Sequence, residues 1–131
     1  MNHELSRKPA ATLRRLQADD APQLAVLFQR LAQDPEAARF FHPHPLSAAA
    51  ADELCRTLAI TRDRYYVADR CGPLIGYMML RGWDEGYTVP SFGCAVDPRF
   101  RGAGLGRRLL ETAIAESRAC GAAPIRRHSA G

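Results

Sequence analysis

The chain has 131 residues, of which 47% are hydrophobic and 24% charged, and its formal net charge at pH 7 is +4. This length and composition fit one globular domain with a modest core and leave little room for two. No apolar run approaches the roughly 18 residues that span a membrane, and the segment Met1–Pro9 is polar rather than shaped like a secretion signal. We therefore expect a cytoplasmic protein with a disordered leader at residues 1–10 and a single domain at 11–131.

The cysteines, histidines and arginines limit the kinds of site. The cysteines are Cys55, Cys71, Cys94 and Cys120. They are widely separated and form no C-x-x-C pair, so we expect free thiols and no zinc site. His42 and His44 lack a third ligand, and the prolines beside them favour a stiff loop, so we expect no metal. The arginines are scattered except for one cluster at residues 99–108, which suits a small polyanion better than nucleic acid.

The first half of the chain reads as one strand and three helices. Alternation over residues 11–17 predicts the strand. Asp20 as N-cap and Pro22 in the first turn begin a helix with apolar residues at helical spacing. A short helix over residues 34–40 ends before a proline-rich loop, and a third helix runs from the cap at Ser47 to about Ile60.

The second half reads as three strands and a helix. Residues 64–69 and 74–80 predict an antiparallel hairpin, in which Gly76 marks a bulge or a close approach. A third strand covers residues 91–96. From Leu105 an amphipathic pattern predicts a helix that ends at Gly121.

A glycine-rich segment joins the strand at residues 91–96 to the last helix. It reads Arg101-Gly102-Ala103-Gly104-Leu105-Gly106-Arg107-Arg108. Glycines let several backbone N–H groups converge on one ligand, at a helix start where the dipole favours an anion. The flanking arginines add charge-assisted hydrogen bonds. We therefore predict a diphosphate-binding site.

Two common nucleotide motifs do not fit this segment. The pattern G-x-x-x-x-G-K-[ST] is absent, and G-x-G-x-x-G would need glycine where Arg107 stands. The alternative is a glycine-rich turn that only joins a strand to a helix. The spacing and the arginines favour the ligand site.

The same segment resembles a known family. Val96-Asp97-Pro98, the glycine-rich segment and Leu109-Leu110 together resemble the acetyl-CoA signature [RQ]-x-x-G-x-[GA] of the GNAT N-acetyltransferases. The order of elements from Ala11 to Gly121 supports the resemblance. It implies an α/β (α+β) fold, with a mixed, mostly antiparallel sheet flanked by helices.

The resemblance also implies a cofactor and its contacts. Acetyl-CoA would place its diphosphate at the glycine-rich segment and its pantetheine beside the preceding strand, whose backbone would polarise the thioester. The implied coenzyme contacts are Cys94, Ala95, Val96, Arg101, Gly102, Ala103, Gly104, Leu105, Gly106 and Arg107. The side chain of Cys94 itself is expected in the core. The general acid of such enzymes, often a tyrosine beyond a fifth strand, has no assignable equivalent.

The end of the sequence departs from the family pattern. After Gly121 only Ile125 suggests a strand, Pro124 removes a ladder donor, and Arg126-Arg127-His128 suits a buried parallel strand poorly. We therefore expect a domain that is incomplete after about residue 121. The strand ending at Val96 would then be an exposed edge, which predicts homodimerisation, strand exchange or aggregation.

The sequence supports one function and leaves two alternatives open. We expect transfer of an acetyl group from acetyl-CoA to a primary amine of a small molecule, with an amino sugar favoured by the segments Phe40–Pro45 and Trp83–Tyr87. Glu85 is the candidate base, and the alternative is that it lies in a solvated turn without a catalytic role. Among the tyrosines, Tyr87 is the least improbable catalytic residue. The alternatives are a degenerate CoA-binding protein without turnover and a basic module that binds nucleic acid.

Overall fold

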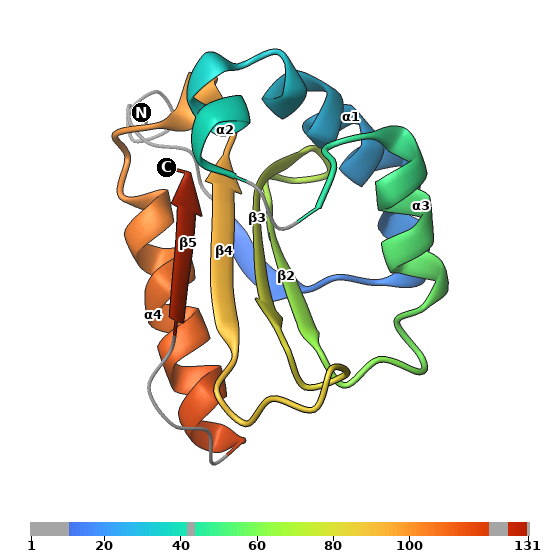
Figure 1. The fold of residues 1–131 in the computed structure, drawn as a ribbon. Helices are drawn as coiled ribbons and strands as arrows, with labels where there is room; N and C mark the ends of the chain where they lie inside the picture. The colour runs from blue at the N-terminus through green and yellow to red at the C-terminus, as the bar shows by residue number, and fades with distance from the viewer. Residues whose placement is uncertain (1–10, 42–43, 121–125, 131) are drawn as a thin grey trace.

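The computed structural model describes residues 11–41, 44–120 and 126–130, which form a mixed sheet covered by helices on both faces (Figure 1). The strands follow the order β1-β2-β3-β4-β5 across the sheet. Their bounds are Thr12–Arg15, Arg64–Asp69, Leu74–Arg81, Ser91–Val96 and Arg126–Ala130. Neighbours from β1 to β4 are antiparallel, and β5 is parallel to β4. The α/β class with a mostly antiparallel sheet is confirmed.

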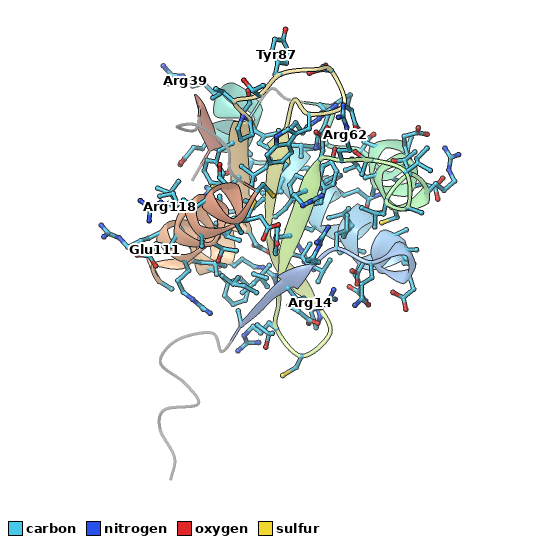
Figure 2. All side chains as sticks on the ribbon, turned by 90° about the horizontal axis from the view of Figure 1, so that it is seen from below. Arg14, Arg39, Arg62, Tyr87, Glu111 and Arg118 are labelled. Atoms are coloured by element: carbon cyan, nitrogen blue, oxygen red, sulfur yellow. The ribbon has the colours of Figure 1, made fainter. Side chains whose placement is uncertain are left out.

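Helices divide between the two faces. The bounds are α1 Ala21–Ala32, α2 Pro35–Phe40, α3 Ala48–Arg56 and α4 Leu105–Ala119, with short 3-10 turns at Ala18–Asp20 and Pro98–Phe100. One apolar core holds side chains of α1 and α3 with Tyr65, Tyr77 and Ala95 of the sheet. The other holds side chains of α4 with Tyr66 and Cys94. Figure 2 shows the two groups of helices on opposite sides of the sheet.

Helix boundaries follow local chemistry. Asp34 accepts a hydrogen bond from the Ala37 N–H and begins α2, and Ser47 accepts one from the Ala50 N–H and begins α3. Helix α3 ends at Arg56, earlier than the expected Ile60. The C-cap residue Thr57 has φ −100° and ψ 5°, which is outside the helical region, and its hydroxyl donates to the Glu53 carbonyl at 3.0 Å, a local bond typical of helix ends.

The expectation of a chain without a fifth strand is wrong. Strand β5 pairs with β4 from Ser91 opposite Arg126 to Ala95 opposite Ala130. A ladder is made by backbone groups, and an edge strand has a neighbour on one side only, so charged residues are tolerated there. Pro124 lies outside the described residues. Strand β4 is therefore an inner strand, and the argument that its exposed edge drives dimerisation does not hold.

Gly76 lets α4 approach the sheet. A Cβ built there would lie 3.2 Å from Ala68 Cβ, 3.3 Å from Leu105 Cδ2 and 3.4 Å from Leu109 Cδ1. The register of β2 and β3 also shifts between Ala68 and Asp69. Both the close approach and the bulge predicted around Gly76 are confirmed.

Within the described parts of the chain, no helix is both long and apolar enough to cross a membrane. The first strand and the hairpin lie where the sequence predicts them.

We predict that Gly76→Val lowers the free energy of unfolding by about 1 to 3 kcal/mol, because its methyl groups push α4 away from β3. Gly76→Ala should cost less, since the neighbouring contacts need to yield only slightly. Urea denaturation of both variants measures the effect. A Gly76→Val protein as stable as the wild type would contradict the close packing of α4.

Candidate functional site

The glycine-rich segment turns sharply between the 3-10 turn at Pro98–Phe100 and α4. Gly102 has φ +84° and Gly104 has φ +80°, a left-handed conformation that glycine adopts without strain. No atom lies within 4 Å of a Cβ built at either position. The backbone conformation therefore requires the glycines, and their outer side has room for a ligand.

The start of α4 offers unused hydrogen-bond donors. Gly104 is the N-cap residue and makes no side-chain cap. The Arg108 N–H bonds to the Gly104 carbonyl at 3.1 Å, so Leu105, Gly106 and Arg107 precede the first donor of the helical ladder. Three N–H groups at the positive end of a 15-residue helix fit an anion, and together with the open glycines they fit a diphosphate.

Asp97 fixes the path of the chain from β4 into this loop. Its side chain is fully buried and accepts from the Arg99 N–H at 3.0 Å and from the Arg99 guanidinium at 2.9 Å. Arg30 of α1 adds an ion pair at 3.5 Å. Burial raises the pKa of the Asp97 carboxyl, but the hydrogen bonds from Arg99 outweigh burial and lower the pKa below its ordinary value. The carboxylate therefore stays charged and keeps the loop in place.

A positive surface flanks the loop. The guanidinium carbons of Arg70 and Arg99 each lie 5.4 Å from the centroid of the Phe100 ring. Arg107 is exposed at the start of α4. This local charge favours an anionic ligand.

Arg101 takes a different position from Arg107. Its Nη2 donates to Asp34 Oδ2 at 2.6 Å, and its Nη1 lies 3.6 Å from Glu36 Oε1. The hydrogen bond from Arg101 lowers the pKa of the Asp34 carboxyl. Arg101 Nε is buried and has no hydrogen-bond partner among the described residues. From the sequence both arginines are expected to contact the coenzyme, whereas the structure directs Arg101 toward α2.

The residues implied as pantetheine contacts lie at the end of β4. Cys94, Ala95 and Val96 are buried and pair with Met78, Tyr77 and Gly76 of β3, respectively. The Cys94 side chain lies in the core beneath α4, as expected. On the other edge β5 pairs as far as Ala95, and Val96 lies beyond the last paired residue.

An aromatic cluster covers this end of the sheet on the face of α1 and α2. The His44 ring lies between Phe28, Phe41 and Tyr77, at centroid distances of 5.2 to 5.6 Å. His44 Nδ1 donates to the Pro45 carbonyl at 2.8 Å, and Nε2 accepts from the Tyr77 hydroxyl at 2.9 Å. Burial lowers the pKa of His44, so the ring is neutral at pH 7.

Both ring nitrogens of His44 are therefore engaged, and His42, the other candidate ligand, lies outside the described residues. In the part of the chain that the structure covers, no three His, Cys, Asp or Glu side chains gather as a metal site would require.

Glu85 lies in the loop between β3 and β4, at the opposite end of β4 from the glycine-rich segment. The Asp63 carboxylate holds this loop by accepting from the N–H groups of Gly82 and Trp83 at 3.1 and 3.0 Å. Glu85 is exposed, and Tyr87 is 55% exposed at the outer tip of the loop (Figure 2). The length of β4 alone separates the two loops by about 17 Å. The role of Glu85 as a base stays a prediction.

Many solved structures share the fold, and three of them are described here. The ribosomal-protein-alanine N-acetyltransferase from Brucella melitensis biovar Abortus 2308 matches with a TM-score of 0.64 and 18% identity, over 92% of this chain and 81% of its own. The Salmonella typhimurium protein yncA, solved with its cofactor acetyl-CoA, matches with a TM-score of 0.66 and 20% identity, over 86% of this chain and 66% of its own. The paia N-acetyltransferase from Thermoplasma acidophilum, in complex with coenzyme A, matches with a TM-score of 0.66 and 16% identity, over 86% of this chain and 75% of its own. No curated protein matches the chain.

The geometry, with open left-handed glycines before a helix that packs on a mixed sheet, suits a class of protein that binds an anion at the start of that helix. The family model described as the acetyltransferase (GNAT) family matches residues 25–126, which is most of the chain. The chain therefore belongs to the acetyltransferase (GNAT) family, and it is an acyltransferase, as the signature at residues 101–106 predicted.

We predict that Gly104→Ala lowers the free energy of unfolding by about 1 to 2 kcal/mol, because alanine is strained at φ +80°. Gly104→Asn should lose less, since asparagine adopts this conformation more readily and fills the same open space. Urea denaturation compares the two variants. Equal losses in the two variants would contradict the left-handed backbone conformation as the reason for glycine at this position.

Proposed function

We propose that this protein transfers an acetyl group from acetyl-CoA to a primary amine of a small molecule. One observation carries the proposal: two left-handed glycines lead into the uncapped start of α4, in a chain that belongs to an acetyltransferase family. The N–H groups of residues 105–107 would bind the coenzyme diphosphate, and the exposed Arg107 side chain would add a charge-assisted hydrogen bond. Glycines 102 and 104 would let the backbone approach the phosphates, and Ala103 lies between them.

The pantetheine part of the coenzyme would run along the end of β4, at Cys94, Ala95 and Val96. That edge is paired with β5 as far as Ala95. We therefore also propose that the end of β5, near Ala130, separates from β4 when the coenzyme binds. Val96, past the last paired residue, is the point from which the separation would begin.

The reaction requires an uncharged amine. Its nitrogen attacks the thioester carbonyl, its proton passes to a base, and the C–S bond breaks as the coenzyme thiolate takes up a proton. We propose Glu85 as the base. We propose an amino sugar as the acceptor, because the loop at residues 83–87 and the segment at residues 40–45 resemble those of sugar-modifying members of the family. Oriented binding of the two substrates would supply much of the rate enhancement.

A second candidate function has its own support. The pairing of β5 along β4 competes with pantetheine for the same backbone edge, which favours a CoA-binding protein that does not turn over. A panel of amine acceptors separates the two functions, because coenzyme binding without acetylation of any amine would leave only the second.

We also propose the cytoplasm as the compartment and no nucleic acid as partner. None of the four cysteines, all of which lie in the described residues, forms a disulfide, and reduced cysteines such as the exposed Cys71 and Cys120 are typical of reducing compartments. The positive groups gather at a small loop rather than along an extended surface with aromatic residues for base stacking. A homodimer stays a prediction without the support of an exposed β4.

We predict that Arg107→Ala weakens the affinity for acetyl-CoA about tenfold, because a charge-assisted hydrogen bond to phosphate is lost. Arg118→Ala is the matched control, since it removes the same charge from an exposed position of α4 about 17 Å further along the helix. Calorimetric titration of acetyl-CoA measures both. An equal loss of affinity in the two variants would show that Arg107 acts only through the net charge of the protein and not through a contact with the coenzyme.

We further predict that Ser129→Pro tightens acetyl-CoA binding several-fold. Proline is poorly tolerated within a paired strand, and Ser129 lies in register with Cys94, so the substitution favours separation of the two strands. Ser129→Ala, which keeps the backbone N–H, is the control. Weaker binding in the proline variant would mean that the paired form of β5 supports the coenzyme site.

A further inference from the structure

Two arginines lie over the ring of Phe100, just before the glycine-rich segment. The guanidinium carbons of Arg70 and Arg99 each lie 5.4 Å from the centroid of this ring. The two arginines come from different elements, since Arg70 follows β2 in the hairpin turn and Arg99 belongs to the 3-10 turn after β4. Like charges near the same ring repel each other, and an anion beside them relieves the repulsion.

The two arginines differ in how far their charge is balanced. Arg99 donates through Nε and Nη2 to the Asp97 carboxylate, at 3.2 and 2.9 Å, so most of its charge is compensated. Arg70 is exposed, and among the described residues no carboxylate pairs with it. Its backbone N–H bonds to the Pro73 carbonyl at 2.8 Å and closes the hairpin turn. The turn and the Phe100 ring therefore hold Arg70, while its charge is left unbalanced.

The hairpin turn lies beside the start of α4. The Ile75 carbonyl accepts the Asp97 N–H at 2.9 Å, which joins the start of β3 to the end of β4. A Cβ built on Gly76 would lie 3.3 Å from Cδ2 of Leu105, the first residue of α4. Phe100 packs against the core that contains Leu105. The ring and its arginines are therefore next to the uncapped start of α4.

The chain also limits how far the ring can lie from the proposed diphosphate site. Phe100 comes four residues before Gly104, the N-cap residue of α4. Consecutive Cα atoms lie about 3.8 Å apart, so the Cα atoms of these two residues are at most about 15 Å apart. A nucleotide held by its diphosphate at residues 105–107 is long enough to span this distance.

Acetyl-CoA carries a phosphate group besides its diphosphate. This group is an ester on the 3′ oxygen of the ribose, whose 5′ oxygen carries the diphosphate, so the two anionic groups are separated only by the sugar. As a phosphate monoester it is largely a dianion at pH 7. A guanidinium binds such a group through two parallel hydrogen bonds, which a planar pair of N–H donors fits.

We propose that Arg70 binds the 3′-phosphate of the coenzyme and that Phe100 positions the guanidinium for this contact. Arg70 sets a preference for the 3′-phosphorylated coenzyme over forms that lack this phosphate. Arg99, already bound to Asp97, adds to the local positive potential. This inference rests on the proposed function, and it adds a specificity-determining residue for the acetyl donor.

Calorimetric titration with acetyl-CoA and with acetyl-3′-dephospho-CoA tests the assignment. In the wild type we expect the dephospho form to bind about tenfold more weakly, because a charge-assisted hydrogen bond is lost. Arg70→Ala should bring this ratio of affinities below about threefold, by weakening the binding of acetyl-CoA. Phe100→Leu keeps an apolar side chain but removes the ring, so it should give an intermediate ratio.

Two further arginine variants are the controls. Arg118→Ala removes the same charge from the far end of α4 and should leave the ratio at its wild-type value. Arg107→Ala should weaken the binding of both forms in the same proportion, because its proposed contact is with the diphosphate that both forms contain.

Equal affinities of the wild type for the two forms overturn the assignment and leave the proposed function intact. A wild-type ratio in Arg70→Ala also overturns it, and so does an equal fall of the ratio in Arg70→Ala and in either control. A wild-type ratio in Phe100→Leu overturns the positioning role of the ring. No binding of acetyl-CoA to the folded wild type overturns the proposed function and the assignment together.

Discussion

The buried carboxylate of Asp97 is the constraint on which the site depends. The Asp97 N–H bonds to the Ile75 carbonyl at 2.9 Å and so keeps the end of β4 on β3. Its side chain then holds the 3-10 turn that follows through Arg99. The direction in which α4 leaves the sheet follows from these contacts, and Leu105 and Leu109 bring the helix onto Gly76. One charged group, kept ionised in the interior by its partners, thus sets where the helix dipole points.

The sequence predicted the elements whose signals are local. Alternating and helical spacing identified the strands and helices, caps at Asp34 and Ser47 identified two helix starts, and the glycine pattern identified the loop. Strand β5 was missed because its pairing with β4 is a backbone interaction that its charged side chains do not reveal. The contact of Arg101 with Asp34 was missed because 67 residues separate the two, and no local pattern encodes such a distance.

The candidate site divides into a part fixed by backbone geometry and a part fixed by side chains. The glycine-rich segment, the proposed diphosphate site, belongs to the first kind, since φ angles and N–H groups define it, and its motif can therefore be recognised in the sequence. The side proposed for the acceptor belongs to the second kind. The His44 and Tyr77 pair arises where a loop folds over a strand, and the start of the loop between β3 and β4, at Gly82 and Trp83, is held by the carboxylate of Asp63. For such a site, the type of a residue alone does not reveal which side chain or backbone group it will contact in the fold.

Strand β4 gives its consecutive residues to two different cores. Cys94 packs beneath α4, the helix that follows the proposed coenzyme site, whereas Ala95 packs with α1 and Tyr77, on the side proposed to meet the amine. Mutations that reshape one core therefore leave the side chains of the other largely untouched. Selection for a new amine acceptor can therefore change the core on the side of α1 while the core beneath α4 is inherited unchanged. In such an enzyme the specificity for the acceptor and the specificity for the acetyl donor are free to evolve at different rates.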